Sequence, residues 1–305
     1  VYPDDGDNAS ELLRKADSAM YHAKEHDRNT YSFFTEAMNR DVSRRLALEE
    51  QMHGALGRDE FEVLYQPKME IGCGRIIGAE ALLRWNNSAL GNVSPAEFIP
   101  IAEQTGFIDS IGRFVLDESL AHTALWQSGY DADFHIAVNI SPCQFRDPQM
   151  VSYINDAMLK NGITRGSLEL EITEGMLLAG HSFIDDVLAQ LKNIGVSIAM
   201  DDFGTGYSSL SYLRKYPFDV LKIDRSFVVD ITVDQADREL INATIAMAHS
   251  LNLKVVAEGV ETDGQLNYLE EQGCDYAQGY LFSKPISADE LTVLLDIDVR
   301  MAQRK

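Results

Sequence analysis

SLELEITE (167–174), SIAMDDFG (197–204) and VLKIDRSF (220–227) are three apolar runs that each end in charged residues. Their lengths and continuous apolar character are typical of strands buried on both faces of a parallel sheet. Segments with helical periodicity, such as 182–193 and 235–250, lie between or after them. Strands that alternate with helices require right-handed crossovers, so this part of the chain predicts an α/β fold with a parallel sheet.

The same alternation extends in both directions and covers the chain from residue 58 onward. It opens with a hairpin, FEVLYQPKMEI (61–71) and RIIGAEALLRW (75–85), so the first strand is expected to run antiparallel. The remaining strands are FHIAVNIS (134–141), KVVAEGVE (254–261) and DYAQGYLF (275–282). Further helices are expected over 95–105, 111–127, 148–160 and 264–272. Eight strands in roughly 240 residues predict a TIM-like (β/α)8 barrel. An open doubly wound sheet is the alternative, but no G-x-G-x-x-G follows a first strand.

The first 57 residues have a different pattern. Residues 1–34 suggest a helix capped by Ser10, followed by a strand at YSFF (31–34), which together are too small to bury a core. The start, without a methionine, suggests a cut inside a longer protein. Residues 35–57 predict a linker helix that stops at Gly57, either packed on its neighbour or pairing between protomers. The main domain is expected over 58–298, with a tail at 299–305.

Composition excludes several classes of function. The 305 residues carry 48 acidic and 26 basic side chains, for a net charge of −22, which argues against binding duplex nucleic acid. No apolar run reaches the ~18–20 residues of a membrane span. Cys73, Cys143 and Cys274 form no C-x-x-C pair, so we expect free thiols and a cytoplasmic location, although the parent protein could be membrane-anchored. Without H-E-x-x-H, any metal must be bound by oxygen ligands.

The polar residues at the strand ends predict a site. They are Glu80, Asn139, Glu171, Glu174, Asp201, Asp202, Lys222, Asp224, Glu258, Glu261 and Gln278. In a β/α barrel the carboxyl ends of the strands share one face, where active sites are built. Each acid alone could cap a helix or pair with a lysine or arginine. Together, so many carboxylates repel each other unless cations neutralise them, and oxygen ligands select Mg²⁺ or Mn²⁺.

More carboxylates than one ion needs indicate two metals, an arrangement that serves attack on a phosphate ester. Asp201, in the pair Asp201-Asp202, is the natural bridging ligand, and Lys222 and Arg84 are cations suited to phosphate oxygens. The loop GTGYSSL (204–210) that follows is either a mobile cover for the site or a tight turn.

Seven motifs in this order resemble the EAL family of cyclic di-GMP phosphodiesterases. They are EALLRW (80–85), VNIS (138–141), ELEITE (169–174), DDFGTGYSSL (201–210), KIDRSF (222–227), AEGVE (257–261) and QGYLFSKP (278–285). The resemblance runs from about residue 58 to 295. It implies a barrel with an antiparallel first strand, and metal-dependent hydrolysis of cyclic di-GMP to linear pGpG.

The resemblance also implies roles for individual residues. The first metal would be bound by Glu80, Asn139, Glu171 and Asp201, and the second by Asp201, Asp202 and Glu258. Glu258 also matches the family's general base, Lys222 the residue that orients the attacking water, and Glu174 the acid that anchors the 204–210 loop. Arg84 and Gln278 correspond to contacts with phosphate and guanine. Mg²⁺ or Mn²⁺ is expected to support turnover, and Ca²⁺ to inhibit it.

A second resemblance concerns residues 1–34, which are similar to the C-terminal end of a GGDEF (diguanylate cyclase) domain. It implies a parent chain with GGDEF and sensory parts upstream, and the EAL resemblance implies a homodimer. Because the motif set is intact, we expect an active enzyme. The alternative is a catalytically silent receptor for cyclic di-GMP, and another is a Mg²⁺-dependent barrel enzyme that acts on a phosphorylated metabolite.

Overall fold

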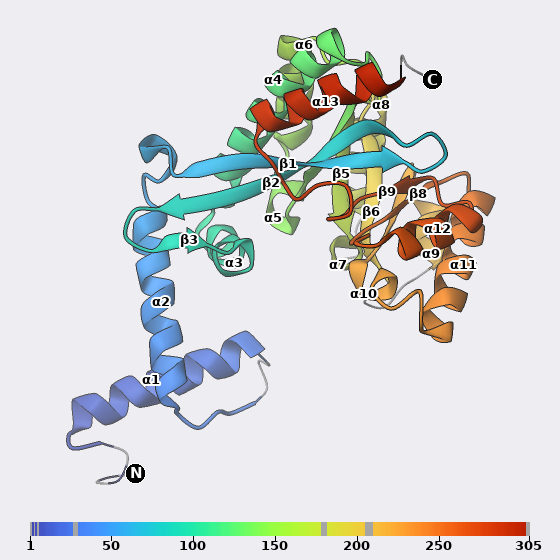
Figure 1. The fold of residues 1–305 in the computed structure, drawn as a ribbon. Helices are drawn as coiled ribbons and strands as arrows, with labels where there is room; N and C mark the ends of the chain where they lie inside the picture. Colours follow the sequence, from blue (N-terminus) through green and yellow to red (C-terminus); the bar gives the residue numbers. More distant parts are fainter. Residues whose placement is uncertain are drawn as a thin grey trace. The chain divides into compact units, whose positions relative to one another are not determined.

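The computed structural model of the chain describes residues 2, 4, 6–26, 30–177, 182–204 and 210–302. It divides into two compact units. Unit 1 comprises residues 1–60 and 85–105, and unit 2 comprises residues 61–84 and 106–305. Figure 1 labels the elements in chain order.

Unit 2 is a closed barrel of eight strands. The strands are β1 (Phe61–Glu70), β2 (Arg75–Asn87, whose last three residues belong to unit 1), β4 (His135–Asn139), β5 (Leu168–Thr173), β6 (Ser197–Phe203), β7 (Val220–Ile223), β8 (Lys254–Ala257) and β9 (Tyr276–Ala277). Their order is β1-β9-β8-β7-β6-β5-β4-β2, and the pairing of β1 with β2 closes the ring. β1 is antiparallel to β9, whereas β2 and β4 to β9 pair in parallel. The predicted TIM-like barrel with an antiparallel first strand is therefore confirmed.

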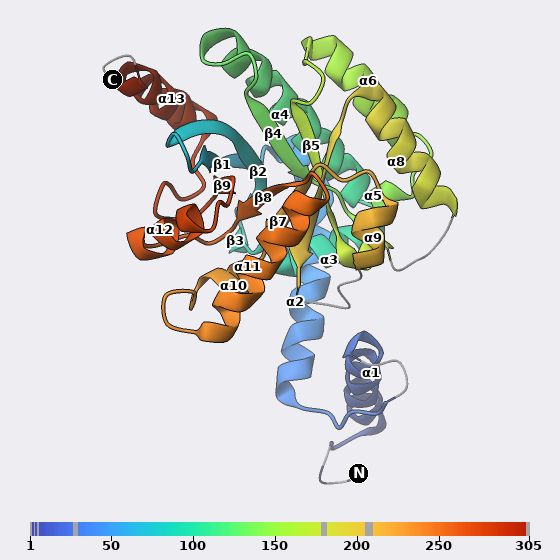
Figure 2. The same ribbon diagram turned by 90° about the vertical axis from the view of Figure 1, so that its right-hand side faces the viewer.

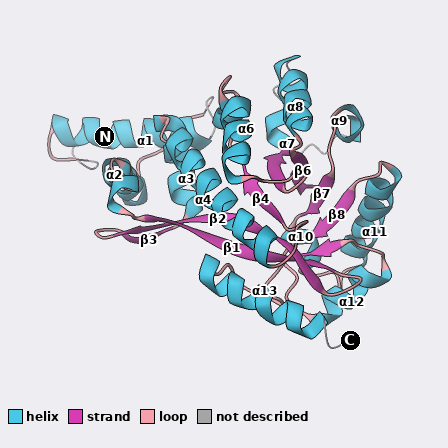
Figure 3. Ribbon diagram, turned by 90° about the horizontal axis from the view of Figure 1, so that it is seen from above, coloured by secondary structure: helices cyan, strands magenta, loops and turns pink. Residues whose placement is uncertain are grey.

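Helices surround the barrel (Figure 2). They are α4 (Ile108–Gly129), α5 (Pro142–Phe145), α6 (Met150–Asn161), α7 (Glu174–Leu177), α8 (Ser182–Ile194), α9 (Leu210–Lys215), α10 (Arg225–Val228), α11 (Gln235–Ser250), α12 (Asp263–Glu271) and α13 (Ala288–Ala302). Figure 3 shows helix following strand along most of the chain. α4 packs on β1 and β4, α11 on β7 and β8, and α13 on β1. No described helix is long and apolar enough to span a bilayer.

Most of the long helices lie close to the predicted ranges, but α13 and the short helices were not predicted. Residues 235–250 form α11 with the expected bounds, because Asp234 caps the first turn with its carboxylate and apolar residues recur at helical spacing. Helices of four to six residues, such as α5, α7, α9 and α10, are shorter than any window that shows a 3.6-residue period, and the sequence did not predict them.

Unit 1 contains α1 (Ala9–His26), α2 (Glu36–Met52), the 3-10 turn η1 (Leu56–Arg58), β3 (Gly91–Val93) and α3 (Pro95–Thr105). The buried Glu60 organises its core: Oε1 accepts from Arg58, and Oε2 accepts from the Trp85 indole at 3.1 Å and from Asn87. These contacts, that with Arg58 foremost, lower the pKa of Glu60 to about 2. Glu60 therefore remains charged and is fully paired, and serves a structural purpose.

Three expectations for this region are corrected. Residues 30–35 are irregular, so the strand expected at YSFF is not formed; no described strand pairs with this segment, and a strand needs a hydrogen-bonded neighbour. The linker helix expected over 35–57 is shorter, because α2 ends at Met52 and Gly54 adopts a left-handed conformation. The cap of α1 is Asn8, whose Oδ1 accepts from the Glu11 amide, and not Ser10.

Candidate active site

The register of the barrel strands brings the strand-end acids together. Asn139 on β4 lies directly opposite Glu171 on β5, and Thr173 lies opposite Asp201 on β6. On the other side of the barrel, β7 and β8 end in parallel, so Glu258 follows the last strand residue beside Ile223. Residues that are far apart in the sequence therefore meet at one end of the barrel, as the pattern predicted.

Lys222 lies at the centre of this group. Its Nζ is 2.6 Å from Glu171 Oε2, 2.6 Å from Glu258 Oε1 and 3.2 Å from Asp201 Oδ1. Glu80 Oε2 is 3.8 Å away. We call these four carboxylates and the lysine the acidic cluster. The Lys222 and Glu171 side chains are fully buried, so these charges interact strongly.

The acidic cluster carries more negative than positive charge, since four carboxylates surround one ammonium. Burial, followed by the charge of Glu80, raises the pKa of Glu171 well above its usual value. Burial also raises the pKa of Glu258 to about 7, with Asp201 and Glu80 adding to the effect against Lys222. Without further cations, both carboxylates therefore take up protons more readily than an ordinary glutamate, and Glu258 does so near neutral pH.

Two amide side chains hold Glu80 in place. Asn139 Nδ2 donates to Glu80 Oε1 at 2.8 Å, and Gln278 Nε2 donates to Glu80 Oε2 at 2.6 Å. Burial alone would raise the pKa of Glu80, but Lys222 and these two donors lower it below its usual value. Glu80 thus stays ionised more easily than Glu171 or Glu258. Since both amide nitrogens face Glu80, the amide oxygens of Asn139 and Gln278 are directed elsewhere.

A cavity of about 260 Å³ opens beside the acidic cluster. Its wall includes Glu80, Asp201, Lys222, Glu258, Glu261 and Gln278, so six of the predicted strand-end residues face one space. The other residues that line it are Gln66, Leu82, Arg225, Gly259, Gly279 and Tyr280. We call this space the acidic cavity. Its position beside the carboxylates makes it the place where a substrate can reach them.

An irregularity in β6 explains how two consecutive aspartates can serve one site. Neighbouring strand residues normally point to opposite faces, which would separate Asp201 from Asp202. The β6–β7 register shifts between Met200 and Phe203, and Asp202 has a left-handed backbone with φ 54°. Such a bulge changes the direction in which the following side chains point, although Asp202 does not line the acidic cavity. Burial and then the charges of Asp201 and Asp224 raise the pKa of Asp202, so it lies in the field of the cluster.

The donor set fits hard divalent cations. It consists of carboxylate and amide oxygens, and among the described residues the buried oxygens Glu171 Oε1 and Gln278 Oε1 have no hydrogen-bond partner. No three acidic, histidine or cysteine side chains of the described residues are arranged to share one ion. Lys222 Nζ occupies the point where the carboxylates meet. Metal binding therefore requires these side chains to turn away from the ammonium.

The structure leaves three predicted features apart from the cluster. Arg84 lies four residues beyond Glu80, about 13 Å farther along β2. It donates to the Leu83 carbonyl and does not line the acidic cavity. Glu174 is buried at the start of α7, three residues after Glu171. Residues 205–209 of the predicted mobile loop lie outside the described residues, so its contact with Glu174 stays a prediction.

Sequence reasoning missed two interior residues of β1. Gln66 lines the acidic cavity and accepts from Gln278 at 3.1 Å. Lys68, two residues on, is fully buried and donates to Glu169 Oε1 at 2.6 Å. The signal was the i, i+2 spacing of two polar residues in the middle of the strand, which places both on the same face of the sheet.

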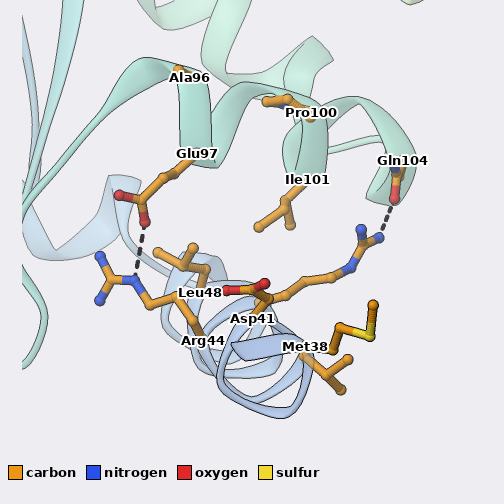
Figure 4. Close-up of a pocket in the computed structure, with 11 residues that line it drawn as sticks. Met38, Asp41, Arg44, Leu48, Ala96, Glu97, Pro100, Ile101 and Gln104 are labelled. Atoms are coloured by element: carbon orange, nitrogen blue, oxygen red, sulfur yellow. Dashed lines mark hydrogen bonds and ion pairs between the residues drawn. The ribbon is translucent and has the colours of Figure 1, made fainter. Parts of the chain in front are cut away.

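A second cavity, of about 360 Å³, lies within unit 1 between α2 and α3 (Figure 4). Met38 and Leu48 on α2 and Ile101 on α3 contribute apolar side chains from its two sides. The Arg44–Glu97 ion pair at 3.0 Å and a hydrogen bond from Arg45 to Gln104 bridge the two helices across it. It gathers no group of carboxylates comparable to the acidic cluster, so size alone does not identify the site of chemistry.

Comparison with known proteins agrees with this geometry. The EAL domain signature matches residues 49–285. The chain is 43% identical over 291 residues to the "Bifunctional diguanylate cyclase/cyclic di-GMP phosphodiesterase MucR" of Pseudomonas aeruginosa, covering 95% of this chain and 42% of MucR. It is 40% identical over 287 residues to the "Cyclic di-GMP phosphodiesterase NbdA" of the same organism, covering 94% of this chain and 36% of NbdA. The chain thus spans about two fifths of the curated relatives it matches.

Solved structures show the same fold. The "PaMucR Phosphodiesterase, c-di-GMP complex" superposes with a TM-score of 0.77 at 42% identity, covering 80% of this chain and 99% of that one. The "EAL enzyme Bd1971" in its cAMP-bound form gives a TM-score of 0.80 at 33% identity, covering 94% of this chain and 78% of that one. Sequence signature, relatives and fold agree, and the chain belongs to the EAL domain family.

Proposed function

We propose that this chain hydrolyses cyclic di-GMP to linear pGpG. The observation that carries the proposal is the convergence of Glu80, Glu171, Asp201 and Glu258 on one end of the barrel, beside a cavity. The names of MucR and NbdA and the cyclic di-GMP complex of the former support this substrate. A cluster of acids with excess negative charge is suited to cations that assist attack on a phosphodiester.

We further propose two divalent cations, Mg²⁺ or Mn²⁺, as cofactors. Glu80, Asn139, Glu171 and Asp201 would hold the first, and Asp201, Asp202 and Glu258 the second. When bound, the cations would neutralise the cluster and stabilise the negative charge that develops on the phosphate. Ca²⁺ is expected to inhibit, because it prefers longer bonds and more ligands than these side chains offer.

Other roles in the reaction, namely proton transfer, orientation of the water and contacts with the substrate, would fall to the chain's own residues. Glu258, whose pKa is about 7, is suited to accept a proton from the attacking water near neutral pH. Lys222, once the carboxylates turn to cations, has an ammonium free to orient that water. The buried Gln278 Oε1 can accept a hydrogen bond from a guanine N–H. Arg84 is proposed to contact phosphate, and Glu174 to anchor the 204–210 loop.

One observation favours a second candidate. Because Lys222 already pairs with the acids, the chain could bind cyclic di-GMP without turning it over, as a receptor. Incubating the purified chain with cyclic di-GMP and Mg²⁺, Mn²⁺ or Ca²⁺, followed by chromatography, separates the two. Formation of pGpG with Mg²⁺ or Mn²⁺ is the expected result. Tight binding without product under both ions would favour the receptor.

Further proposals concern the longer protein. Residues 1–34 are proposed to be the end of a GGDEF domain; in support, the 291-residue alignment with MucR must include part of this segment. A GGDEF portion and sensory domains would precede it, and the EAL domain would form a homodimer. We do not expect the chain to bind duplex nucleic acid, because its net charge is −22. Sedimentation of the purified chain tests the dimer.

A further inference from the structure

Arg225 is the second cation that lines the acidic cavity, and the proposed function does not use it. Of the described lining residues, Lys222 and Arg225 carry positive charge. Lys222 is buried and has four carboxylates within 4 Å. The Arg225 side chain, in contrast, is 57% exposed and pairs with a single carboxylate, Glu261, at 2.7 Å. Arg225 is therefore the cation of the cavity that an incoming anion can reach.

The backbone of Gly259 fixes the position of the Arg225 side chain. A Cβ on Gly259 would lie 2.2 Å from Arg225 Cγ and 2.8 Å from Arg225 Cβ, so the aliphatic stem of the arginine lies flat on this backbone. Gly259 also adopts φ +69°, which favours glycine. Because Gly259 directly follows Glu258, the guanidinium is tied to the segment that carries a residue of the acidic cluster.

The ion pair with Glu261 is suited to exchange. Exposed ion pairs contribute little to stability, so opening this one costs little. A phosphodiester can take the place of the carboxylate, because arginine binds both groups through the same fork of donors. Glu261 thus keeps Arg225 oriented until an anion replaces it.

We propose that Arg225 binds the non-reacting phosphodiester of the substrate and so selects cyclic dinucleotides. This inference rests on the proposed function. A cyclic dinucleotide carries two phosphodiesters, and only one can occupy the acidic cluster at a time. The other must lie elsewhere in the cavity, in a surrounding rich in carboxylates, where Arg225 offers the accessible positive charge.

The test compares Arg225→Gln with Arg75→Gln, whose arginine forms a similar exposed pair with Asp131 at 3.0 Å outside the acidic cavity. For cyclic di-GMP, Arg225→Gln is expected to raise KM about 10- to 100-fold with a smaller change in kcat, as the loss of a charge-assisted contact implies. Arg225→Lys should recover part of the loss. The kcat/KM for bis(p-nitrophenyl) phosphate, which carries one phosphodiester, should fall far less.

Glu261→Gln tests the alternative that the Arg225–Glu261 ion pair only stabilises the local structure. Our proposal expects no rise in KM, because the guanidinium remains and loses a competitor. A rise in the KM of Glu261→Gln equal to that of Arg225→Gln would overturn the proposal. Two other results would also overturn it: an equal loss of kcat/KM in Arg225→Gln on both substrates, or a KM of Arg225→Gln that matches that of Arg75→Gln. If the wild-type chain turns over neither substrate, the proposed function has failed; if only these comparisons fail, that function stands.

Discussion

Replacing Lys222 by methionine removes the single ammonium among four carboxylates while keeping most of the length of the side chain. Lys222 is 1% exposed, and Glu171, Asp201 and Glu258 lie within 3.2 Å of its Nζ. Removing one partner of a buried pair costs about 3–5 kcal/mol, because the remaining charges lose their compensation. For a chain of 305 residues that corresponds to about 5–8 °C in melting temperature.

The assay is thermal unfolding in the presence of EDTA, with Lys254→Met as the control. Lys254 also pairs with a carboxylate, Asp275 at 2.7 Å, but its side chain is 59% exposed, so the control should lose less than about 1 kcal/mol. The loss in Lys222→Met should grow as the pH rises. Burial raises the pKa values of Glu171 and Glu258 in the folded chain, and loss of the ammonium raises them further. These two groups therefore bind more protons in the folded than in the unfolded chain, and stability falls as those protons leave.

Divalent cations should restore much of the stability of Lys222→Met, since they bind the folded form and neutralise the same carboxylates. The reasoning is refuted if Lys222→Met melts within 2 °C of Lys254→Met in EDTA, a threshold of about 1 kcal/mol. It is also refuted if the pH dependence of the two variants is the same.

Three other outcomes follow from the geometry. Mg²⁺ binding should release protons, and its affinity should rise between about pH 5 and 8, because burial raises the pKa of Glu171 and brings that of Glu258 to about 7. Calorimetry in buffers of different ionisation enthalpy measures this proton release, and finding none would contradict the prediction. Asp201→Asn should lower turnover of cyclic di-GMP more than ~100-fold while binding persists, and near-native turnover would remove Asp201 from the metal set. Gly279→Ala should lower the free energy of unfolding in urea by about 1–3 kcal/mol, because its Cβ would lie 2.1 Å from the Val260 carbonyl oxygen. Gly129→Ala, whose Cβ would meet nothing within 4 Å, is the control, and equal stabilities of the two variants would refute the clash.

The sequence predicted the barrel because strand alternation and helical periodicity are local signals. Seven of the eight barrel strands lie within the predicted runs, β2 extends two residues beyond its run, and the helix over residues 95–105 has its predicted bounds. β9 is reduced to Tyr276–Ala277 and β3 was missed, since strand length depends on which neighbours pair with it. The expected strand at YSFF failed for the same reason: its pattern is compatible with a strand, but no described strand pairs with it.

The sequence predicted which strand-end acids meet at the candidate site, but it did not predict how their charges are balanced. That Glu80, Glu171, Asp201 and Glu258 would meet followed from strand ends sharing one face of a barrel. The central position of Lys222 did not follow from the sequence. The alternation of side chains along a strand tells which face of the sheet a side chain lies on, but not which side chain lies at the centre of the cluster. The bulge at Asp202 depends on backbone geometry between strands, which residue types alone do not specify.

Anomalous diffraction from crystals soaked in Mn²⁺ would locate the cations among these carboxylates. The account predicts two peaks, one beside Glu80, Glu171 and Asp201 and one beside Asp201 and Glu258, with Lys222 Nζ displaced from its 2.6 Å contacts. At saturating Mn²⁺, the absence of both peaks with the lysine still paired to Glu171 and Glu258 would contradict it.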